Sequence, residues 1–515
     1  MQGARAGQSS MRGSTLGADP SLDSGTRSRT TDQAAAAQPP AVGSQQTGEG
    51  DPKRMVESNE ERAWALLNAA KVYYRGRPVG TVAARDEGTT QVNYDQVFTR
   101  DVAVSAFAEL LVGRYEMTRH VLEELARLQQ HARQFDCFQP GQGVMPASFK
   151  VSADAEDVGL IADFGERAIG RVPPVDSGFW WLLILHAYVA ASGDRAFAER
   201  EPMQAAIRRI LDLSLTIHFD MFPTMLVPDG SFMIDRRMGV YGYPLDIQAL
   251  FFAALRAAET LLSPDPANAI YRAAASTRQE HLVYHVRKYY WLDLEHLERM
   301  HRAPVEEYGE DASNQFNVYP DTIPDWLVDW LPDTGGYFAG NVGPGRMDYR
   351  YFAFGNLLSI VSGLANGEQR AALLSLNSKR AQDLLGQVPL KLIFPALEGT
   401  SWSLVTGMDP KNRPWSYHNG GSWPSLIWLL AAACTICGTS ERLDPALDAL
   451  DARLGSDGWP EYYDGRRGQL LGRQARRYQT WTVAGYLIAR HLRRHPEDIA
   501  RLGFDGIAQG SACTV

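Results

Sequence analysis

The chain has 515 residues, of which 45% are hydrophobic and 22% are charged, a composition typical of a globular protein with room for a large core. Its formal net charge of −9 argues against nucleic acid or anionic membranes as the main partner, because neutralising phosphates requires a basic surface. Neutral or weakly charged ligands fit this charge better.

Cysteine usage and hydropathy indicate the compartment. Four cysteines are too few for a secreted disulfide framework in a chain of this length. Cys434 and Cys437 form a C-x-x-C pair inside an apolar run, which favours core packing over redox or metal chemistry. No N-terminal apolar segment resembles a signal peptide, and the longest apolar runs are short for a membrane span. We therefore predict a soluble, cytoplasmic protein.

The first 54 residues differ in composition from the rest. Residues 1–54 contain no aromatic residue and no isoleucine, so they cannot bury enough surface to offset the entropy of ordering. We predict a disordered tail, followed by one folded domain over residues 55–515. An organelle-targeting role stays open because the tail carries Arg5, Arg12, Arg27 and Arg29, although Asp19, Asp23 and Asp32 count against it.

Helical patterns dominate the remaining chain. A capping-box pattern at Ser58 opens the first helix. Apolar residues then recur at helical spacing over 102–112, 115–131, 177–192, 194–218, 244–262, 267–295, 351–364, 367–386, 423–438, 443–454 and 479–494. Short hairpins are expected only near 79–92 and 224–238.

Twelve helices suggest a closed arrangement. With alternating short and long connections they form six helical hairpins, which predicts an all-α fold, the (α/α)6 barrel or toroid, with the long loops meeting at one mouth. A helical solenoid would show the same count of helices, but no fixed-length sequence repeat favours it.

Several loops combine acids, arginines and aromatic residues. One neighbouring Asp–Arg pair is more often a structural ion pair than a site, but recurrence before successive helices favours a shared pocket. Carboxylates and guanidinium groups suit sugar hydroxyls, and aromatic faces suit the C–H surface of a sugar ring. The candidate residues in these loops are Tyr94, Arg100, Asp101, Arg167, Asp176, Trp180, Asp235, Arg236, Asp348, Arg350, His418, Asn419, Trp423 and Glu461.

The stretch from Asp163 to Trp181 offers a catalytic acid. Hydrolysing a glycoside takes one protonated carboxyl group and one ionised carboxylate. Asp176 lies directly before an apolar helix and could simply be its N-cap. A cap aspartate is stabilised as an anion, which opposes the raised pKa that an acid needs. We therefore predict that Ser177 caps the helix and that Asp176 faces the pocket as the acid.

Glu461 is the candidate base. It lies in the loop WPEYYDGR between aromatic residues, where the alternative is a solvated loop acid. Arg466, Arg467 or Arg473 could keep it ionised, although a subunit contact or a solvated face explains these arginines equally well. No metal or cofactor is predicted, because the cysteines and histidines form no cluster with zinc spacing, and His418 is expected to contact a sugar hydroxyl. The absence of an Asp-Asp pair disfavours a terpene cyclase.

The motifs resemble those of the alkaline/neutral invertases of glycoside hydrolase family 100. The resemblance is carried by YDQVFTRD, DFGERAIGRVPPVDSGFWW, IDRRMGVYGYPLD, FNVYPDTIPDWLVDW, MDYRYFAFGNL, GMDPKNRPWSYHNGGSWP and WPEYYDGR, and it spans roughly residues 60–490. Two features depart from the family pattern: the tail is not shared, and Arg346 stands where the family commonly shows a histidine.

The resemblance implies a metal-free, cytosolic (α/α)6 catalytic domain that hydrolyses sucrose to glucose and fructose with inversion, and a homo-oligomeric assembly. It implies that Asp176 is the general acid and Glu461 the general base. It also implies that the sucrose pocket is lined by Arg100, Asp101, Arg167, Trp180, Asp235, Arg236, Asp348, Arg350, His418, Asn419 and Trp423. Two alternatives stay open, a glycosidase of the same fold that acts on another α-glucoside and a sugar-binding toroid without catalysis.

Overall fold

The computed structural model describes residues 58–88, 93–131, 141–152, 159–167, 172–216, 222–303, 314, 316, 318–343, 346–471 and 475–504. These residues fall in one compact unit of the chain. The predicted tail, Cys137, Arg473 and Cys513 lie outside the described residues.

Six helices form a closed inner ring. Each packs against the next in the order α2, α4, α7, α11, α15 and α18, and α18 packs back against α2. Closure distinguishes a toroid from a solenoid, so the predicted (α/α)6 barrel is confirmed. The ring helices are α2 (Thr99–Leu111), α4 (Ser177–Ser192), α7 (Leu245–Leu261), α11 (Ala353–Ser362), α15 (Ile427–Ile436) and α18 (Thr480–Arg494).

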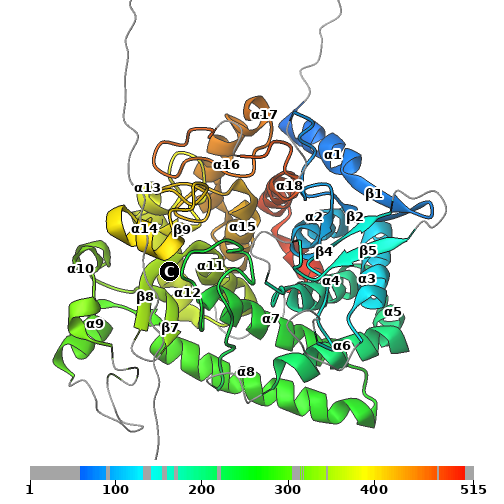
Figure 1. Cartoon of the computed structure of the whole chain (residues 1–515), viewed down its shortest axis with the longest axis horizontal. Coiled ribbons are helices and arrows are strands. Elements are labelled where there is room, and N and C mark those ends of the chain that lie inside the picture. The colour runs from blue at the N-terminus through cyan, green and yellow to red at the C-terminus, as the bar shows by residue number, and fades with distance from the viewer. Residues whose placement is uncertain are drawn as a thin grey trace, which may run out of the picture. The chain divides into compact units, whose positions relative to one another are not determined.

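Six further helices pack on the outside of this ring, as Figure 1 shows for α1, α3, α6 and α8. Ring helix α4 is buried on nearly every face, whereas outer helix α3 is buried along one stripe only, as expected for a helix with one side in water. The outer helices are α1 (Asn59–Ala69), α3 (Glu116–Leu128), α6 (Glu201–Ser214), α8 (Ala269–Tyr289), α12 (Gly367–Lys379) and α16 (Asp444–Asp451). All twelve predicted helices are therefore present.

Short elements fill the connections between the long helices. The short α-helices are α5 (Arg195–Glu199), α9 (Leu294–Arg302), α10 (Asp325–Trp330), α13 (Ala381–Leu384), α14 (Gly399–Thr406) and α17 (Leu454–Asp457). The 3-10 helices are η1 (Pro266–Asn268), η2 (Pro320–Thr322), η3 (Pro424–Leu426), η4 (Ser440–Leu443) and η6 (Pro496–Leu502).

The strands form three small antiparallel sheets at the loop end. They are the hairpin β1 (Lys71–Tyr74) and β2 (Arg77–Thr81), the sheet of β3 (Val97–Phe98), β4 (Ser148–Val151) and β5 (Leu160–Asp163), and the sheet of β6 (Trp291–Leu292), β7 (Tyr337–Gly343), β8 (Arg346–Phe352) and β9 (Ile393–Phe394).

Both predicted hairpins need correction. The hairpin expected near 79–92 lies at 71–81, because Arg75 and Gly76 both have positive φ and form the tight turn. The loop expected to be a hairpin near 224–238 contains no strand in its described residues. Instead, the carboxylate of Asp229 accepts hydrogen bonds from the backbone N–H groups of residues 238–240, and only a single bridge joins Val227 to Gly242.

All six ring helices begin at the end of the ring where the long connecting loops lie. Within the described residues, none of these helices has a side-chain N-cap. The outer helices α1 and α12, by contrast, begin with complete capping boxes. The free N-termini of the ring helices therefore direct the positive ends of their dipoles toward the loops that precede them.

The C-x-x-C pair lies in this core, as predicted. Cys434 and Cys437 are buried at the C-terminal end of α15 and form no disulfide in the described structure. Burial raises the pKa of the Cys434 thiol to about 12, so it stays protonated and unreactive at neutral pH. Within the described ranges, no helix is long and apolar enough to cross a bilayer.

Candidate active site

A pocket lies at the N-terminal ends of α2, α15 and α18. Three carboxyl groups reach it from three different segments, namely Asp101, Asp235 and Glu461. Its other side chains include Arg100 and an aromatic group made of Tyr94, Phe98, Tyr417, His418, Trp423 and Trp481. Carboxyl groups beside aromatic rings match the predicted sugar site.

Glu461 is buried and lines the pocket. Its Oε1 accepts a hydrogen bond of 2.9 Å from the hydroxyl of Tyr94, and its Oε2 lies 3.4 Å from the Nζ of Lys411. Lys411 also lies 3.8 Å from the centroid of the Tyr417 ring. A cation and a hydroxyl donor both stabilise negative charge on a carboxylate, so these contacts suit Glu461 to act as a base.

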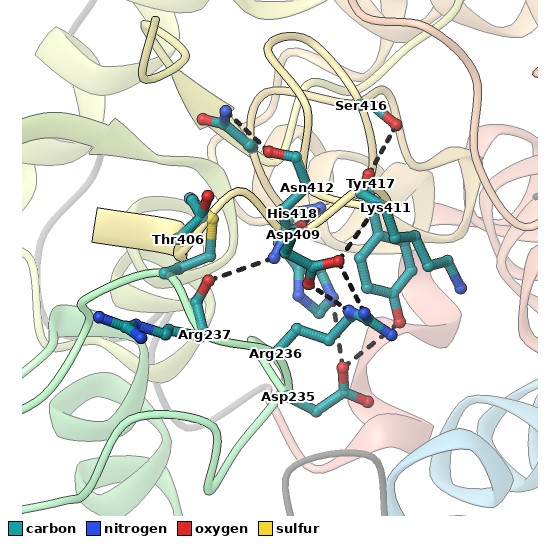
Figure 2. Close-up of polar contacts among 12 residues, drawn as sticks. Asp235, Arg236, Arg237, Thr406, Asp409, Lys411, Asn412, Ser416, Tyr417 and His418 are labelled. Carbon is teal, nitrogen blue, oxygen red and sulfur yellow. Dashed lines mark hydrogen bonds and ion pairs between the residues drawn. The ribbon is translucent and has the colours of Figure 1, made fainter. Parts of the chain in front are cut away.

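Asp235 faces the same pocket from the loop before α7 (Figure 2). Its Oδ1 accepts a 3.3 Å hydrogen bond from the Tyr417 hydroxyl and lies 3.9 Å from Nε2 of His418. About 33% of its side chain is exposed, so a substrate can reach it. Burial among other carboxylates raises the pKa of Asp235, although Arg100 and Lys411 oppose this shift.

Asp101 is the third carboxyl group, in the first turn of α2. It is 8% exposed, and burial raises its pKa to about 7, with the nearby carboxylates Asp235 and Glu461 adding to the shift against Arg100. His418 stays neutral, because burial and the cations around it hold its pKa well below the ordinary value. The pocket therefore combines one paired carboxylate with two carboxyl groups whose pKa values are raised.

Asp176 is buried and forms an ion pair with Arg100, with 2.6 Å between Oδ2 and the guanidinium Nε. It occupies the N-cap position of α4 but makes no capping bond with its side chain, as predicted. Ser177 is the first residue of the helix and not its cap. Asp176 does not line the pocket that holds Glu461, but Arg100, to which it is bonded, does.

The other predicted site residues divide into two groups. Tyr94, Arg100, Asp101, Asp235, His418, Trp423 and Glu461 line the pocket. Arg236 forms a two-bond ion pair with Asp409, and Asp348 does the same with Arg350.

Three further predicted residues also lie apart from the pocket. The side-chain amide of Asn419 bonds to the backbone of Leu397 and Asn412. Trp180 is buried against Phe354 in the ring. Arg167 is exposed, with its backbone carbonyl bonded to Asn93.

Sequence reasoning missed Lys411. Of the three arginines expected to hold Glu461, the two that the structure describes have other partners: Arg466 pairs with Glu398, and Arg467 is exposed beside Asp464, to which its backbone N–H donates. Lys411 precedes the PWSYHNGG stretch, where a cation among Trp, Tyr and Asn was the available signal. In the described part of the chain, no group of three or more His, Cys, Asp or Glu residues could hold a metal ion.

Asp246, in the first turn of α7, has a structural role and gives a pH-dependent prediction. Its Oδ1 accepts a bond from the backbone N–H of Gly355, its Oδ2 has no partner in the described structure, and burial raises its pKa to about 7. A carboxyl group whose pKa is raised on folding destabilises the fold as the pH rises from its unfolded pKa, near 4, through 7. The full cost of this shift is present above pH 7.

Replacing Asp246 by Asn is therefore expected to stabilise the fold at pH 8 and to do little at pH 4. A shift of this size corresponds to about 4 kcal/mol at most, since each pKa unit is worth about 1.4 kcal/mol. Thermal unfolding of the variant and the parent chain at pH 4, 6 and 8 measures the effect. Equal differences in melting temperature at all three pH values would contradict it.

Comparisons with known proteins agree with this architecture. A family model described as alkaline and neutral invertase matches residues 63–496. Cytosolic invertase 1 of Oryza sativa subsp. japonica is 50% identical over 447 residues, covering 86% of this chain and 79% of that protein. Alkaline/neutral invertase CINV1 of Arabidopsis thaliana is 50% identical over 446 residues, covering 86% and 81%.

Two solved structures share the fold at low identity. A bacterial glucoamylase complexed with acarbose aligns with a TM-score of 0.51 at 12% identity, covering 87% of this chain and 57% of that one. A rhamnosidase from Klebsiella oxytoca with rhamnose bound aligns with a TM-score of 0.51 at 12% identity, covering 86% and 65%. At such identities the likeness supports the fold alone.

Proposed function

The chain belongs to the alkaline and neutral invertase family and is a glycoside hydrolase that acts on sucrose; we propose that Glu461 is its general base and Asp235 its general acid. The observation that carries this proposal is the meeting of the two carboxyl groups in one pocket with opposite environments. Lys411 and Tyr94 stabilise negative charge on Glu461, whereas desolvation and the Glu461 carboxylate raise the pKa of the one-third-exposed Asp235 against the opposing effects of Arg100 and Lys411. Two carboxyl groups whose surroundings separate their protonation states are the expected signature of an acid and a base.

Asp235 replaces Asp176 in this proposal for two reasons. An acid must be free to give its proton to the substrate, but Oδ2 of Asp176 is already bound by the Arg100 guanidinium at 2.6 Å. An acid must also reach the leaving oxygen, and Asp235 lines the pocket that holds the base, whereas Asp176 does not. We assign Asp176 the role of orienting Arg100, which lines the pocket.

The reaction then balances as a single displacement. The carboxyl group of Asp235 gives its proton to the oxygen that joins the two sugars as the anomeric C–O bond breaks. A water molecule on the opposite side attacks the anomeric carbon and gives a proton to Glu461, so one monosaccharide leaves with inverted configuration. Inversion requires about 6.5–9.5 Å between the two carboxyl groups to leave room for that water.

The test of this function is hydrolysis of sucrose followed by proton NMR. We expect release of glucose and fructose in equal amounts, with the first anomer detected opposite to that in the substrate. Trehalose and maltose, assayed in parallel, should be hydrolysed at least about a hundredfold more slowly. Running the reaction in ¹⁸O-labelled water identifies which monosaccharide receives the new oxygen and hence which C–O bond breaks. Retained configuration would overturn the single displacement.

Lys411 is proposed as a positioning residue for the base. Its replacement by Gln removes the cation beside Glu461, so we expect kcat/KM to fall about tenfold near neutral pH and the acidic limb of the pH profile to move up by about one unit. Lys411→Arg keeps the charge and should restore most of the loss. A Gln variant with reduced activity but an unmoved acidic limb would indicate a purely structural role.

Location and assembly remain proposals. The similar plant proteins include cytosolic, chloroplastic and mitochondrial ones, so family membership alone does not fix the compartment. We propose a cytoplasmic enzyme with one catalytic domain over residues 55–515, assembled as a homo-oligomer. Light scattering of the full chain measures the assembly, and a monomer at micromolar concentration would contradict it.

A further inference from the structure

A second cavity, of about 620 Å³, lies near the active site and shares no lining residue with the pocket of Glu461. Its walls come from β8, from β9 and the residues after it, and from the helices α10 and α14. This volume is typical of small-molecule sites. The proposed reaction does not use this cavity.

Arg350 carries a donor without an acceptor. The residue is only 8% exposed, and its Nε and Nη2 both bond to the carboxylate of Asp348. Its Nη1 is buried and has no hydrogen-bond partner among the described residues. A buried charged donor without a hydrogen-bond partner costs free energy. Because Arg350 is among the residues that line the cavity, this unpartnered donor points to a ligand there that supplies an acceptor.

The charges around the cavity favour an anion as that acceptor. Arg346 and Arg466 also line it, which brings three guanidinium groups together. Its two carboxylates are already engaged, because Asp348 is bound by Arg350 and Glu398 accepts from the indole Nε1 of Trp415. Burial would raise the pKa of Asp348, but Arg350 and then Arg346 hold it below its ordinary value. Glu398 also pairs with Arg466, and Arg346 donates to the carbonyl of Gly239. Three guanidinium groups against two carboxylates still leave the lining of the cavity with a net positive charge.

Aromatic rings form much of the remaining wall. Trp330 stacks on Phe394, with 5.2 Å between ring centroids, and Trp326 and Trp415 also face the cavity. Flat aromatic faces suit the C–H surface of a sugar ring, and guanidinium groups bind phosphate through paired bonds. We propose that this cavity is a binding site for a phosphorylated monosaccharide, with the phosphate at the arginines and the sugar ring against the tryptophans.

The loop that carries Asp235 also contributes to the wall of the second cavity. Met238 and Val405 line the second cavity. In the same loop Arg236 bonds to Asp409 and Arg237 donates to the carbonyl of Val405, and the two arginines extend in opposite directions (Figure 2). A ligand against Met238 and Val405 therefore contacts the loop that carries Asp235. An effect of the ligand on sucrose hydrolysis rests on the proposed role of Asp235, but its binding does not.

Calorimetric titration of the full chain with glucose 6-phosphate, fructose 6-phosphate, glucose, fructose and inorganic phosphate tests the site. We expect the phosphorylated sugars to bind at least about tenfold more tightly than either the free sugars or phosphate, because both halves of the ligand are recognised. Arg346→Ala and Arg466→Ala should each weaken binding about tenfold. Arg302→Ala, an exposed arginine of α9, is the matched control and should bind as the parent does.

Two further measurements keep the outcome decisive. Arg350→Lys keeps a charge for Asp348 but removes the unpaired nitrogen, so it should weaken binding without unfolding the chain. Titration of the Glu461→Gln variant in saturating sucrose should leave sugar-phosphate binding intact, whatever that variant's activity. Loss of binding under sucrose would overturn a separate site. Equal affinity for free and phosphorylated sugars, or for inorganic phosphate alone, would overturn the proposed ligand class, and so would unchanged binding in the arginine variants.

Discussion

Replacement of Glu461 by Gln is expected to reduce kcat for sucrose by about 10²- to 10⁴-fold, the usual contribution of a positioned base. Gln has nearly the same shape as Glu and can still accept from the Tyr94 hydroxyl, but it cannot take the proton of the attacking water. KM should change little, because the lost interaction acts mainly in the transition state. Initial rates of glucose release over a range of sucrose concentrations separate the two constants.

The control for this loss is a carboxylate far from the pocket. Glu441 is exposed in η4, so Glu441→Gln should keep the parent rate. Thermal unfolding should show that Glu461→Gln stays folded, because the amide replaces a charge whose bonding partners among the described residues are Lys411 and Tyr94. If Glu461→Gln hydrolyses sucrose at the parent rate, Glu461 is not the base.

The ring of helices could be predicted because its signal is local. Outer helices such as α3 carry an apolar periodicity, ring helices such as α4 are continuous apolar runs, and Ser58 marks the beginning of α1 through a capping box. The strands escaped prediction for the opposite reason. β7 is buried along almost its whole length, so its residues do not alternate between apolar and polar. β3, β6 and β9 have only two residues each and owe their conformation to the strands beside them.

The candidate site could be predicted as a group of loops but not as a set of contacts. Asp176 and Asp235 both lie before a ring helix and near arginines in the sequence, so composition does not separate them. What separates them is the bond between Arg100 and Asp176, which joins residues 76 positions apart. Lys411 and Glu461 are likewise 50 positions apart, so no motif places the cation beside the base.

Neighbouring charges were the least reliable signal. Asp348 and Arg350 stand two positions apart on β8, and their side chains satisfy each other in a cavity distinct from the pocket of Glu461. Arg236 adjoins Asp235, yet it bonds to Asp409 of the segment after α14. An Asp–Arg pattern therefore identified charged loops correctly, whereas the direction of each side chain depended on partners far along the chain.

Replacement of Asp235 by Asn should reduce kcat for sucrose by about 10²- to 10⁴-fold, and this loss should depend on the leaving group. Asn cannot protonate the oxygen between the two sugars. Fluoride leaves without a proton, so Asp235→Asn should hydrolyse α-glucosyl fluoride far better than sucrose if the glucosyl bond is the one that breaks. Glu461→Gln should lose both activities, because both substrates need an activated water.

The same comparison decides between Asp235 and Asp176. Asp176→Asn breaks the ion pair with Arg100, so it should raise KM and reduce the rates on sucrose and on the fluoride alike. The raised pKa of Asp235 also predicts an alkaline limb in the pH profile of the parent, since activity requires the protonated acid. That limb should disappear on α-glucosyl fluoride. If Asp176→Asn rather than Asp235→Asn spares the fluoride, Asp176 is the acid and the pocket must rearrange to bring it to Glu461.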